Sequence, residues 1–88
     1  MALPPNSQLG DLVALIARSL VDQPDQVEVQ EVDNDRGRAD IARIELRVAR
    51  EDIGKVIGKD GRTAQSIRML LAAAASKSGR RAHLDILD

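Results

Sequence analysis

Residues 56–67 read Val56-Ile-Gly-Lys-Asp-Gly-Arg-Thr-Ala-Gln-Ser-Ile67, in which two glycines, Gly58 and Gly61, bracket a Lys-Asp pair. An apolar stretch precedes the glycines and a helix-forming stretch follows them from Arg62. Glycine has no Cβ, so the backbone of a polyanion can approach the main chain closely there. The N–H groups and the positive dipole end of the following helix favour phosphate. The stretch therefore predicts a loop that holds a phosphate backbone.

The sequence around this loop predicts a helix on each side of it. Before the loop, Glu51 and Asp52 lie where acidic residues favour the start of a helix. The short helix that follows them ends at Gly58. After the loop, a longer helix runs from Arg62 to about Ser78, with Gly79 as its C-cap residue. One face of the short helix carries Ile53, Val56 and Ile57, and the core stripe of the long one carries Ala64, Ile67, Leu71, Ala74 and Ala75.

The remaining sequence predicts one more helix and three strands. Apolar residues at helical spacing indicate an amphipathic helix from Asn6 or Ser7 to Val21 or Asp22, where the approach of Pro24 ends it. Alternating residues indicate strands over 27–32, 44–48 and 82–86. Residues 33–40 have turn chemistry, so we expect the first two strands to form an antiparallel hairpin with one face buried. The apolar positions of the first helix are Leu9, Leu12, Val13, Ile16, Ala17 and Leu20.

The order of elements is therefore α-β-β-α-α-β. Three strands packed on one side by three helices make a two-layer α+β domain. With 88 residues there is room for one small domain, which we expect to span residues 7–88 after a flexible N-terminus of residues 1–6. No internal repeat or low-complexity segment interrupts it.

The composition excludes several classes of function. The chain has no cysteine, so it holds no disulfide and no thiolate metal site, and its single histidine, His83, leaves little for imidazole chemistry. We expect no catalytic residues, no metal and no cofactor. The N-terminus carries no basic signal region, and the longest apolar run, residues 69–75, is too short to span a membrane. A cytoplasmic, soluble protein is the expectation.

The formal net charge is −1, but the charges are divided unevenly along the chain. Residues 43–81 contain ten Lys or Arg and four Asp or Glu, a net charge of +6, whereas the rest of the chain carries −7. A folded molecule could therefore present a basic face around the glycine loop. The alternative is that these charges are only a solvated surface with no ligand.

The loop and its flanks resemble the core signature of KH domains, an apolar pair, Gly-x-x-Gly, and apolar positions on the next helix. The helix order is similar to the type II form. The stretches Leu20-Val-Asp-Gln-Pro24 and Asp52-Ile-Gly-Lys-Val-Ile-Gly-Lys-Asp-Gly-Arg-Thr63 resemble the small stand-alone bacterial KH proteins of the KhpA (YlqC-like) family. The resemblance covers nearly the whole chain. It implies a type II KH domain that binds single-stranded RNA as a chaperone or post-transcriptional regulator.

The resemblance also implies roles for individual residues. Phosphates would lie on the loop Gly58, Lys59, Asp60 and Gly61, and bases would lie over an apolar groove formed by Ile53, Ile57 and Ile67. Lys55 and Arg62 add positive charge nearby. The sequence departs from many KH domains at Ala64, where a larger aliphatic residue is usual, and Asp60 puts a carboxylate beside the expected phosphates.

No aromatic residue is present, so the stacking platforms that single-strand binders commonly use are absent. KH-type recognition clamps about four nucleotides, and here aliphatic contact must take the place of stacking. We expect modest affinity that depends on salt, with weak sequence preference. Nothing in the sequence separates RNA from single-stranded DNA.

Other interpretations of these motifs are weaker. A nucleotide-binding P-loop is rejected because three residues separate Gly54 from Gly58 and Asp60 stands where Ser or Thr would bind magnesium. A dinucleotide-binding fingerprint is rejected because the sequence lacks the first glycine of that motif and the strand that precedes it. Asp33 and Asp35 could suggest a cation site, but a solvated turn explains them. His83 is expected on the surface of the last strand, and Thr63 and Ser66 are either groove donors or plain helix surface.

The long helix carries more apolar residues than one core layer can cover. Met69, Leu70, Ala72 and Ala73 lie outside its core stripe, so the uncovered strip predicts a partner surface at Met69, Leu70 and Ala73. The family resemblance implies a homodimer, or a heterodimer with a larger KH protein of the KhpB (Jag-like) type. The rival function is therefore a protein-interaction module with weak or no RNA binding.

Overall fold

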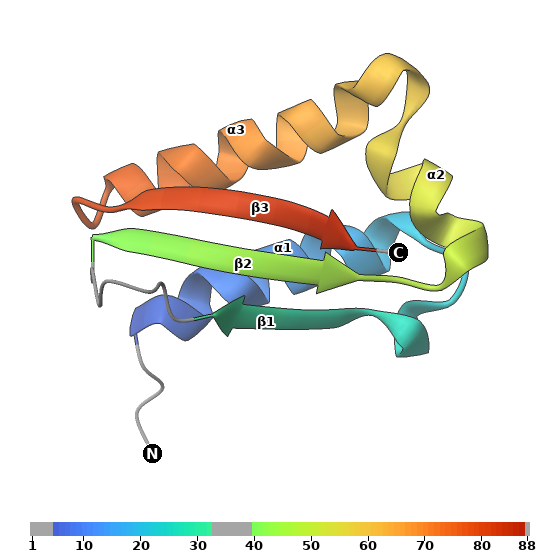
Figure 1. The fold of residues 1–88 in the computed structure, drawn as a ribbon, viewed down its shortest axis with the longest axis horizontal. Coiled ribbons are helices and arrows are strands. Elements are labelled where there is room, and N and C mark those ends of the chain that lie inside the picture. The colour runs from blue at the N-terminus through green and yellow to red at the C-terminus, as the bar shows by residue number, and fades with distance from the viewer. Residues whose placement is uncertain (1–4, 33–39, 88) are drawn as a thin grey trace.

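The structure is a computed structural model that describes residues 5–32 and 40–87 (Figure 1). Its order confirms the predicted α-β-β-α-α-β arrangement of three helices and three strands. Short 3₁₀ turns at Pro24–Gln26, Arg50–Asp52 and Lys59–Gly61 connect some of these elements. The helices are α1 (Pro5–Leu20), α2 (Ile53–Ile57) and α3 (Arg62–Ser76), and the strands are β1 (Glu28–Val32), β2 (Ile41–Arg47) and β3 (Arg81–Leu87).

The three described strands form one mixed sheet in the order β1-β2-β3. β1 pairs antiparallel with β2, with Val29 opposite Leu46, which confirms the predicted hairpin. The turn predicted between them falls largely on residues 33–39, which lie outside the described residues, as do Asp33 and Asp35. β3 pairs parallel with β2, with Ile44 opposite Leu84. A parallel pair needs a long crossover, and α2 and α3 provide it.

The core lies on one face of this sheet. Along β2, Ala42, Ile44 and Leu46 are buried, while Arg43 and Arg47 point to the opposite, outer face. In Figure 1, α1 passes behind the sheet and α3 runs along β3. The helices add to the same buried cluster through Leu9, Val13, Ala17, Val56, Ile67, Leu71 and Ala75.

Two helix boundaries differ from those predicted. α1 begins at Pro5, one or two residues before the predicted start at Asn6 or Ser7. Proline suits the first turn of a helix, because a backbone N–H at that position would have no intrahelical partner. α3 ends at Ser76. The Arg80 N–H then bonds to the Ala75 carbonyl at 2.9 Å across Gly79, whose φ is 70°, and this closes the helix as predicted. None of the helices in the described residues is long and apolar enough to cross a membrane.

Candidate nucleic-acid interface

The loop between α2 and α3 makes a sharp turn in four residues. Gly58 ends α2 with φ 76° and donates its N–H to the Gly54 carbonyl at 2.8 Å. Asp60 and Gly61 follow with φ values of 58° and 74°. Aspartate is among the few residues other than glycine that tolerate a positive φ. The residue types of the loop therefore match the backbone that the turn requires.

The two loop glycines have different surroundings. A Cβ at Gly58 would lie 2.6 Å from the Thr63 Cβ and 2.9 Å from the Thr63 backbone nitrogen. A Cβ at Gly61 would meet nothing within 4 Å. Gly58 is thus required because the loop packs closely on Thr63 in the first turn of α3. Gly61 borders open space.

The start of α3 is suited to an anion. Its N-cap residue is Gly61, which makes no side-chain cap bond, and its first turn contains no acid. The first N–H groups of a helix generally lack intrahelical partners and carry partial positive charge. In α3 the N–H of the first residue, Arg62, donates to the Lys59 carbonyl, so the N–H groups after it remain for an anion. Lys59 and Arg62 are exposed beside them, and within the described residues neither makes an ion pair. The loop therefore offers two uncommitted positive side chains next to a helix N-terminus.

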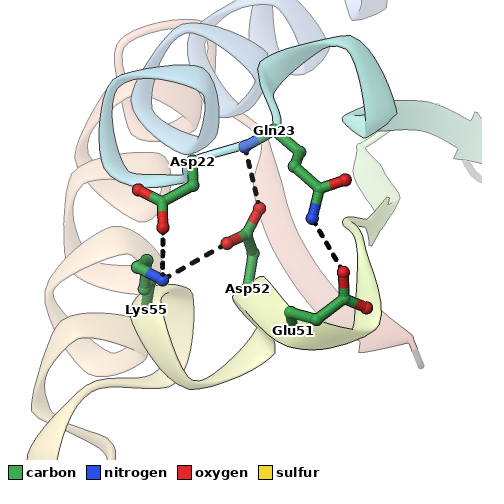
Figure 2. Close-up of polar contacts among 5 residues, drawn as sticks. All are labelled: Asp22, Gln23, Glu51, Asp52 and Lys55. Carbon is green, nitrogen blue, oxygen red and sulfur yellow. Dashed lines mark hydrogen bonds and ion pairs between the residues drawn. The ribbon is translucent and has the colours of Figure 1, made fainter.

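A cluster of polar residues holds α2 against the end of α1 (Figure 2). The Lys55 Nζ lies 3.0 Å from the Asp22 carboxylate and 3.4 Å from that of Asp52. The other Asp52 oxygen accepts the Gln23 backbone N–H at 3.0 Å, and the Gln23 side-chain amide donates to Glu51 at 2.9 Å. These bonds fix the helix that leads into the loop.

Asp52 is 1% exposed, and among the described residues it is the single charged residue that is buried. Burial acts to raise its pKa, but backbone N–H donors of Gln23 and Asp22, together with Lys55, outweigh burial and hold the pKa below its ordinary value. The bonds to Asp22 and Asp52 raise the pKa of Lys55 in turn. Lys55, expected to face phosphate, is thus already bonded to two carboxylates. The sequence did not reveal the bond to Asp22, because Asp22 and Lys55 are far apart in the chain and only the fold brings them together.

The apolar residues expected to form a groove lie at different depths. Ile57, at 38% exposure, is the most accessible, and Ile53 is half-buried against the core. Ile67 is 3% exposed and Ala64 is 4% exposed, so both belong to the interior beneath the surface. The accessible apolar surface beside the loop consists mainly of Ile57 and part of Ile53.

The other predicted candidates lie elsewhere on the surface. Met69 and Leu70 are 67% and 55% exposed on α3, and Ala73 is exposed near them. Ser66 is exposed on the same helix. His83 is exposed on β3, as predicted. In the parts of the chain that the structure describes, no group of three His, Cys, Asp or Glu side chains could hold a metal ion.

One contact near this surface was not predicted. Arg68 of α3 donates from Nε and Nη2 to the backbone carbonyl of Leu84, at 3.4 Å and 3.3 Å. Leu84 lies on β3, which is an edge strand of the described sheet. Helical spacing could place Arg68 beside the core stripe, but it gives no sign of which strand lies next to it.

A family model of known proteins matches this chain. The model described as "KhpA/KhpB, KH domain" matches residues 10–86. A protein named "RNA-binding protein KhpA" from Caldanaerobacter subterraneus subsp. tengcongensis is 53% identical over 79 residues, covering 90% of this chain and 100% of that protein. Proteins of the same name from Halalkalibacterium halodurans and Borreliella burgdorferi are 51% and 42% identical, covering 88% and 89% of this chain and 96% and 90% of their own lengths.

Two solved structures of Era share the fold. Aquifex aeolicus Era bound to GDP.AlF4- superposes with a TM-score of 0.63 and 21% identity, covering 98% of this chain and 31% of the Era chain. Era in complex with MgGDPNP and nucleotides 1506–1542 of 16S ribosomal RNA superposes with a TM-score of 0.63 and 20% identity, covering 96% and 30%. The chain thus spans about a third of each Era chain.

The family match, the identities over most of the chain, and the order of elements around the loop all agree. The chain belongs to the KhpA/KhpB family of KH domains, a non-enzymatic family, and has the type II KH fold.

Proposed function

We propose that this chain binds single-stranded RNA without catalysing a reaction on it. The observation that carries the proposal is the Gly58–Gly61 loop, which turns directly into the uncapped N-terminus of α3 with Lys59 and Arg62 unpaired beside it. Relatives at 42–53% identity are named as RNA-binding proteins, and this supports the same ligand here.

The phosphates bind at the loop. Gly61 leaves open space at the main chain, and the first N–H groups of α3 supply partial positive charge. Lys59 and Arg62 attract the backbone, while Asp60 repels it and keeps the affinity modest. Lys55 acts mainly by holding α2 in place. It contacts phosphate only if it gives up its ion pair with Asp22 or with Asp52.

The bases lie on aliphatic surface. Ile57 and Ile53 contact them, and Ile67 supports this surface from the interior. Aliphatic contact is not specific to one base, so the chain binds many single strands loosely. An RNA chaperone or post-transcriptional regulator acting in the cytoplasm fits such binding.

A single substitution tests the loop without disturbing its packing. Lys59→Asp places a second carboxylate next to Asp60, whereas any side chain at Gly58 collides with Thr63. Reversing one charge near a phosphate should weaken RNA binding about tenfold. Fluorescence anisotropy and crosslinking with a single-stranded RNA measure this effect.

Lys77→Asp provides a matched control, because it makes the same charge change at an exposed residue just after α3. Its affinity should stay within about threefold of the wild-type value, since the site is remote from the loop. Equal crosslinking by the wild type and Lys59→Asp would count against the RNA-binding function and favour the interaction-module function.

The second candidate function is protein association. Met69, Leu70 and Ala73 expose apolar surface on α3, away from the core. Exposed apolar strips of this kind commonly mark partner surfaces. A homodimer, or a heterodimer with a larger KhpB/Jag-like KH protein, would cover the strip. Association would also pair two loops and strengthen RNA binding through avidity.

A further inference from the structure

Lys55 lies beside the proposed RNA site, but carboxylates already hold its side chain (Figure 2). It is part of α2 and precedes Gly58 by three residues and Lys59 by four. Residues at this spacing lie on one side of a helix, so Lys55 leaves α2 on the side where the loop begins. Gly58 is about 4.5 Å further along the helix axis, and the lysine side chain is a flexible four-carbon stem. Lys55 can therefore reach a phosphate that binds at the start of the loop.

The two carboxylates that bind Lys55 have different surroundings. Asp52 is 1% exposed, and the Gln23 backbone N–H donates to it at 3.0 Å, so its charge is stabilised by more than Lys55. The Asp22 side chain is 76% exposed, and Lys55 is its one ion-pair partner among the described residues. The Lys55 Nζ is also nearer to Asp22, at 3.0 Å, than to Asp52, at 3.4 Å. Asp22 therefore holds the ammonium from the exposed side.

These carboxylates hide the charge of Lys55 from a ligand. The bond to Asp22 is the largest cause of the raised pKa of Lys55, ahead of the bond to Asp52, so the ammonium is fully charged at neutral pH. Two negative charges within 3.4 Å nevertheless outnumber this one positive charge. An approaching phosphate is therefore repelled at Lys55 for as long as both ion pairs are present.

RNA can compete for Lys55 at the ion pair with Asp22. The Lys55 side chain is 42% exposed, so a phosphate has access to it. Ion pairs between exposed side chains are only weakly stabilising, because water and salt compete for both charges. Without Asp22, the ammonium would keep only the longer contact to Asp52, whose charge the Gln23 N–H also stabilises. Removal of the Asp22 charge should therefore free Lys55 to turn toward the loop.

We propose that Asp22 limits the affinity of this chain for RNA by holding Lys55 away from phosphate. When the ion pair with Asp22 is broken, Lys55 becomes a third positive side chain for the RNA backbone, in addition to Lys59 and Arg62. The inference rests on the proposed RNA-binding function. Asp22 is a positioning residue, because it touches no RNA and acts through Lys55.

The first test is a gain of RNA affinity. Asp22→Asn removes the charge of an exposed side chain and keeps its shape, so the fold should be preserved. In fluorescence anisotropy with a single-stranded oligo-U RNA at low salt, its affinity should be about three- to fivefold higher than that of the wild type, the range of one exposed ion pair. No gain in Asp22→Asn would overturn the inference.

Asp25→Asn is the matched control for this gain. It removes the same charge from a nearby exposed residue that has no ion pair with Lys55. Its affinity should differ from that of the wild type by less than about twofold, because only long-range repulsion is removed. An equal gain in Asp22→Asn and Asp25→Asn would contradict a specific role of Asp22.

A double-mutant cycle shows whether Asp22 acts through Lys55. Both substitutions are repeated in a Lys55→Met background, which keeps an apolar stem and removes the ammonium. There, Asp22→Asn should increase affinity no more than Asp25→Asn does, because no ammonium remains to be freed. Variants are compared within one background, so any loosening of α2 by Lys55→Met cancels. A gain of about three- to fivefold that persists with Lys55→Met would refute the inference, since Asp22 would then act only by repelling RNA.

The salt dependence of binding counts the phosphates that are contacted. Each added contact to a single strand changes the slope of the logarithm of the binding constant against the logarithm of salt concentration by about −0.7. The slope should therefore change from about −1.4 in the wild type to about −2.1 in Asp22→Asn, and stay near −1.4 in Asp25→Asn. A purely structural role of Asp22 would not produce this change. Equal slopes in the three proteins would count against the inference.

Lys59→Asp separates failure of this inference from failure of the proposed function. If Lys59→Asp weakens binding while Asp22→Asn gives no gain, RNA binding at the loop stands and the role of Asp22 fails. If Lys59→Asp leaves affinity unchanged, the proposed function fails at its own site. Circular dichroism confirms that each variant is folded. Should Asp22→Asn be unfolded, Asp22→Ser removes the same charge and takes its place.

Discussion

Gly58 and Gly61 share a positive φ but differ in the space around them. Gly61→Ala should lower the free energy of unfolding by about 1 to 2 kcal/mol, the cost of a left-handed residue with a Cβ. Gly58→Ala should lower it further, because its Cβ also meets the Thr63 backbone. Urea denaturation of both variants measures the difference, and equal losses would contradict the packing of Gly58 on α3.

Asp52 and Lys55 determine how stability changes with pH. The folded-state pKa of Asp52 lies below its ordinary value of 3.8, so its contribution is complete above that pH and is lost as pH falls through the folded-state pKa. The pKa of Lys55 lies above 10.5, so its contribution is complete below that pH and is lost as pH rises through the folded-state value. The Tm of the wild type should therefore fall as pH is lowered through the folded-state pKa of Asp52, and the Tm of Asp52→Asn should fall less over the same pH range.

Asp25→Asn is the control for this pH experiment. It removes one carboxylate from an exposed position in the turn Pro24–Gln26 and should keep the acid-side fall of the wild type. A fall in Tm that persists unchanged in Asp52→Asn would show that other groups control acid unfolding.

At the same scale, the sequence revealed the loop but not the contacts that support it. Gly58 and Gly61 could be predicted because a positive φ is a local property that favours glycine. The bond from Gln23 to Asp52 could not, because it joins residues that only the fold brings together. Asp52 has the sequence position of a helix cap, yet its side chain makes no cap bond and instead accepts the backbone N–H of Gln23, just after α1.

At the scale of elements, periodicity predicted all three helices and all three strands. The apolar stripes of α1 and α3 and the alternation in β2 reflect burial on one side, which sequence records directly. The direction of β3 was not predicted, since alternation is the same in parallel and antiparallel strands. The 3₁₀ turns were also missed, because three residues are too few to show a period.

The exposed strip on α3 predicts association. Leu70→Glu should convert dimers to monomers, because it places a charge in an apolar interface, and it should leave the fold intact because Leu70 is 55% exposed. Size-exclusion chromatography with light scattering measures the mass. Leu15→Glu, at a residue 65% exposed on α1, is the control and should leave dimers in place. Dimers that persist in Leu70→Glu would remove this interface.

At the scale of the whole molecule, part of the basic charge is neutralised internally. Arg43 pairs with Asp85, and Arg80 pairs with Glu31, so neither is available in full to RNA, as is also true of Lys55. Beside the loop, the positive charge left for the ligand lies on Lys59 and Arg62. The total charge of the segment, which the sequence supplies, therefore overstates the charge that RNA meets.

This distribution predicts a shallow dependence on salt. With about two phosphates neutralised by Lys59 and Arg62, the logarithm of the binding constant should fall with the logarithm of salt concentration at a slope of about −1.4. Anisotropy titrations over a range of KCl concentrations measure the slope. A slope near zero would show that binding does not depend on phosphate contacts.

The position of RNA on the chain can be mapped amide by amide. In ¹⁵N–¹H spectra titrated with a single-stranded RNA, we predict the largest shifts at residues 58–63 and at the first turn of α3, with smaller ones at Leu84. The outer face of the sheet around Arg43 should not change. Shifts confined to Met69–Ala73 or to that outer face, with the loop amides unmoved, would contradict the claim that this loop holds the RNA backbone.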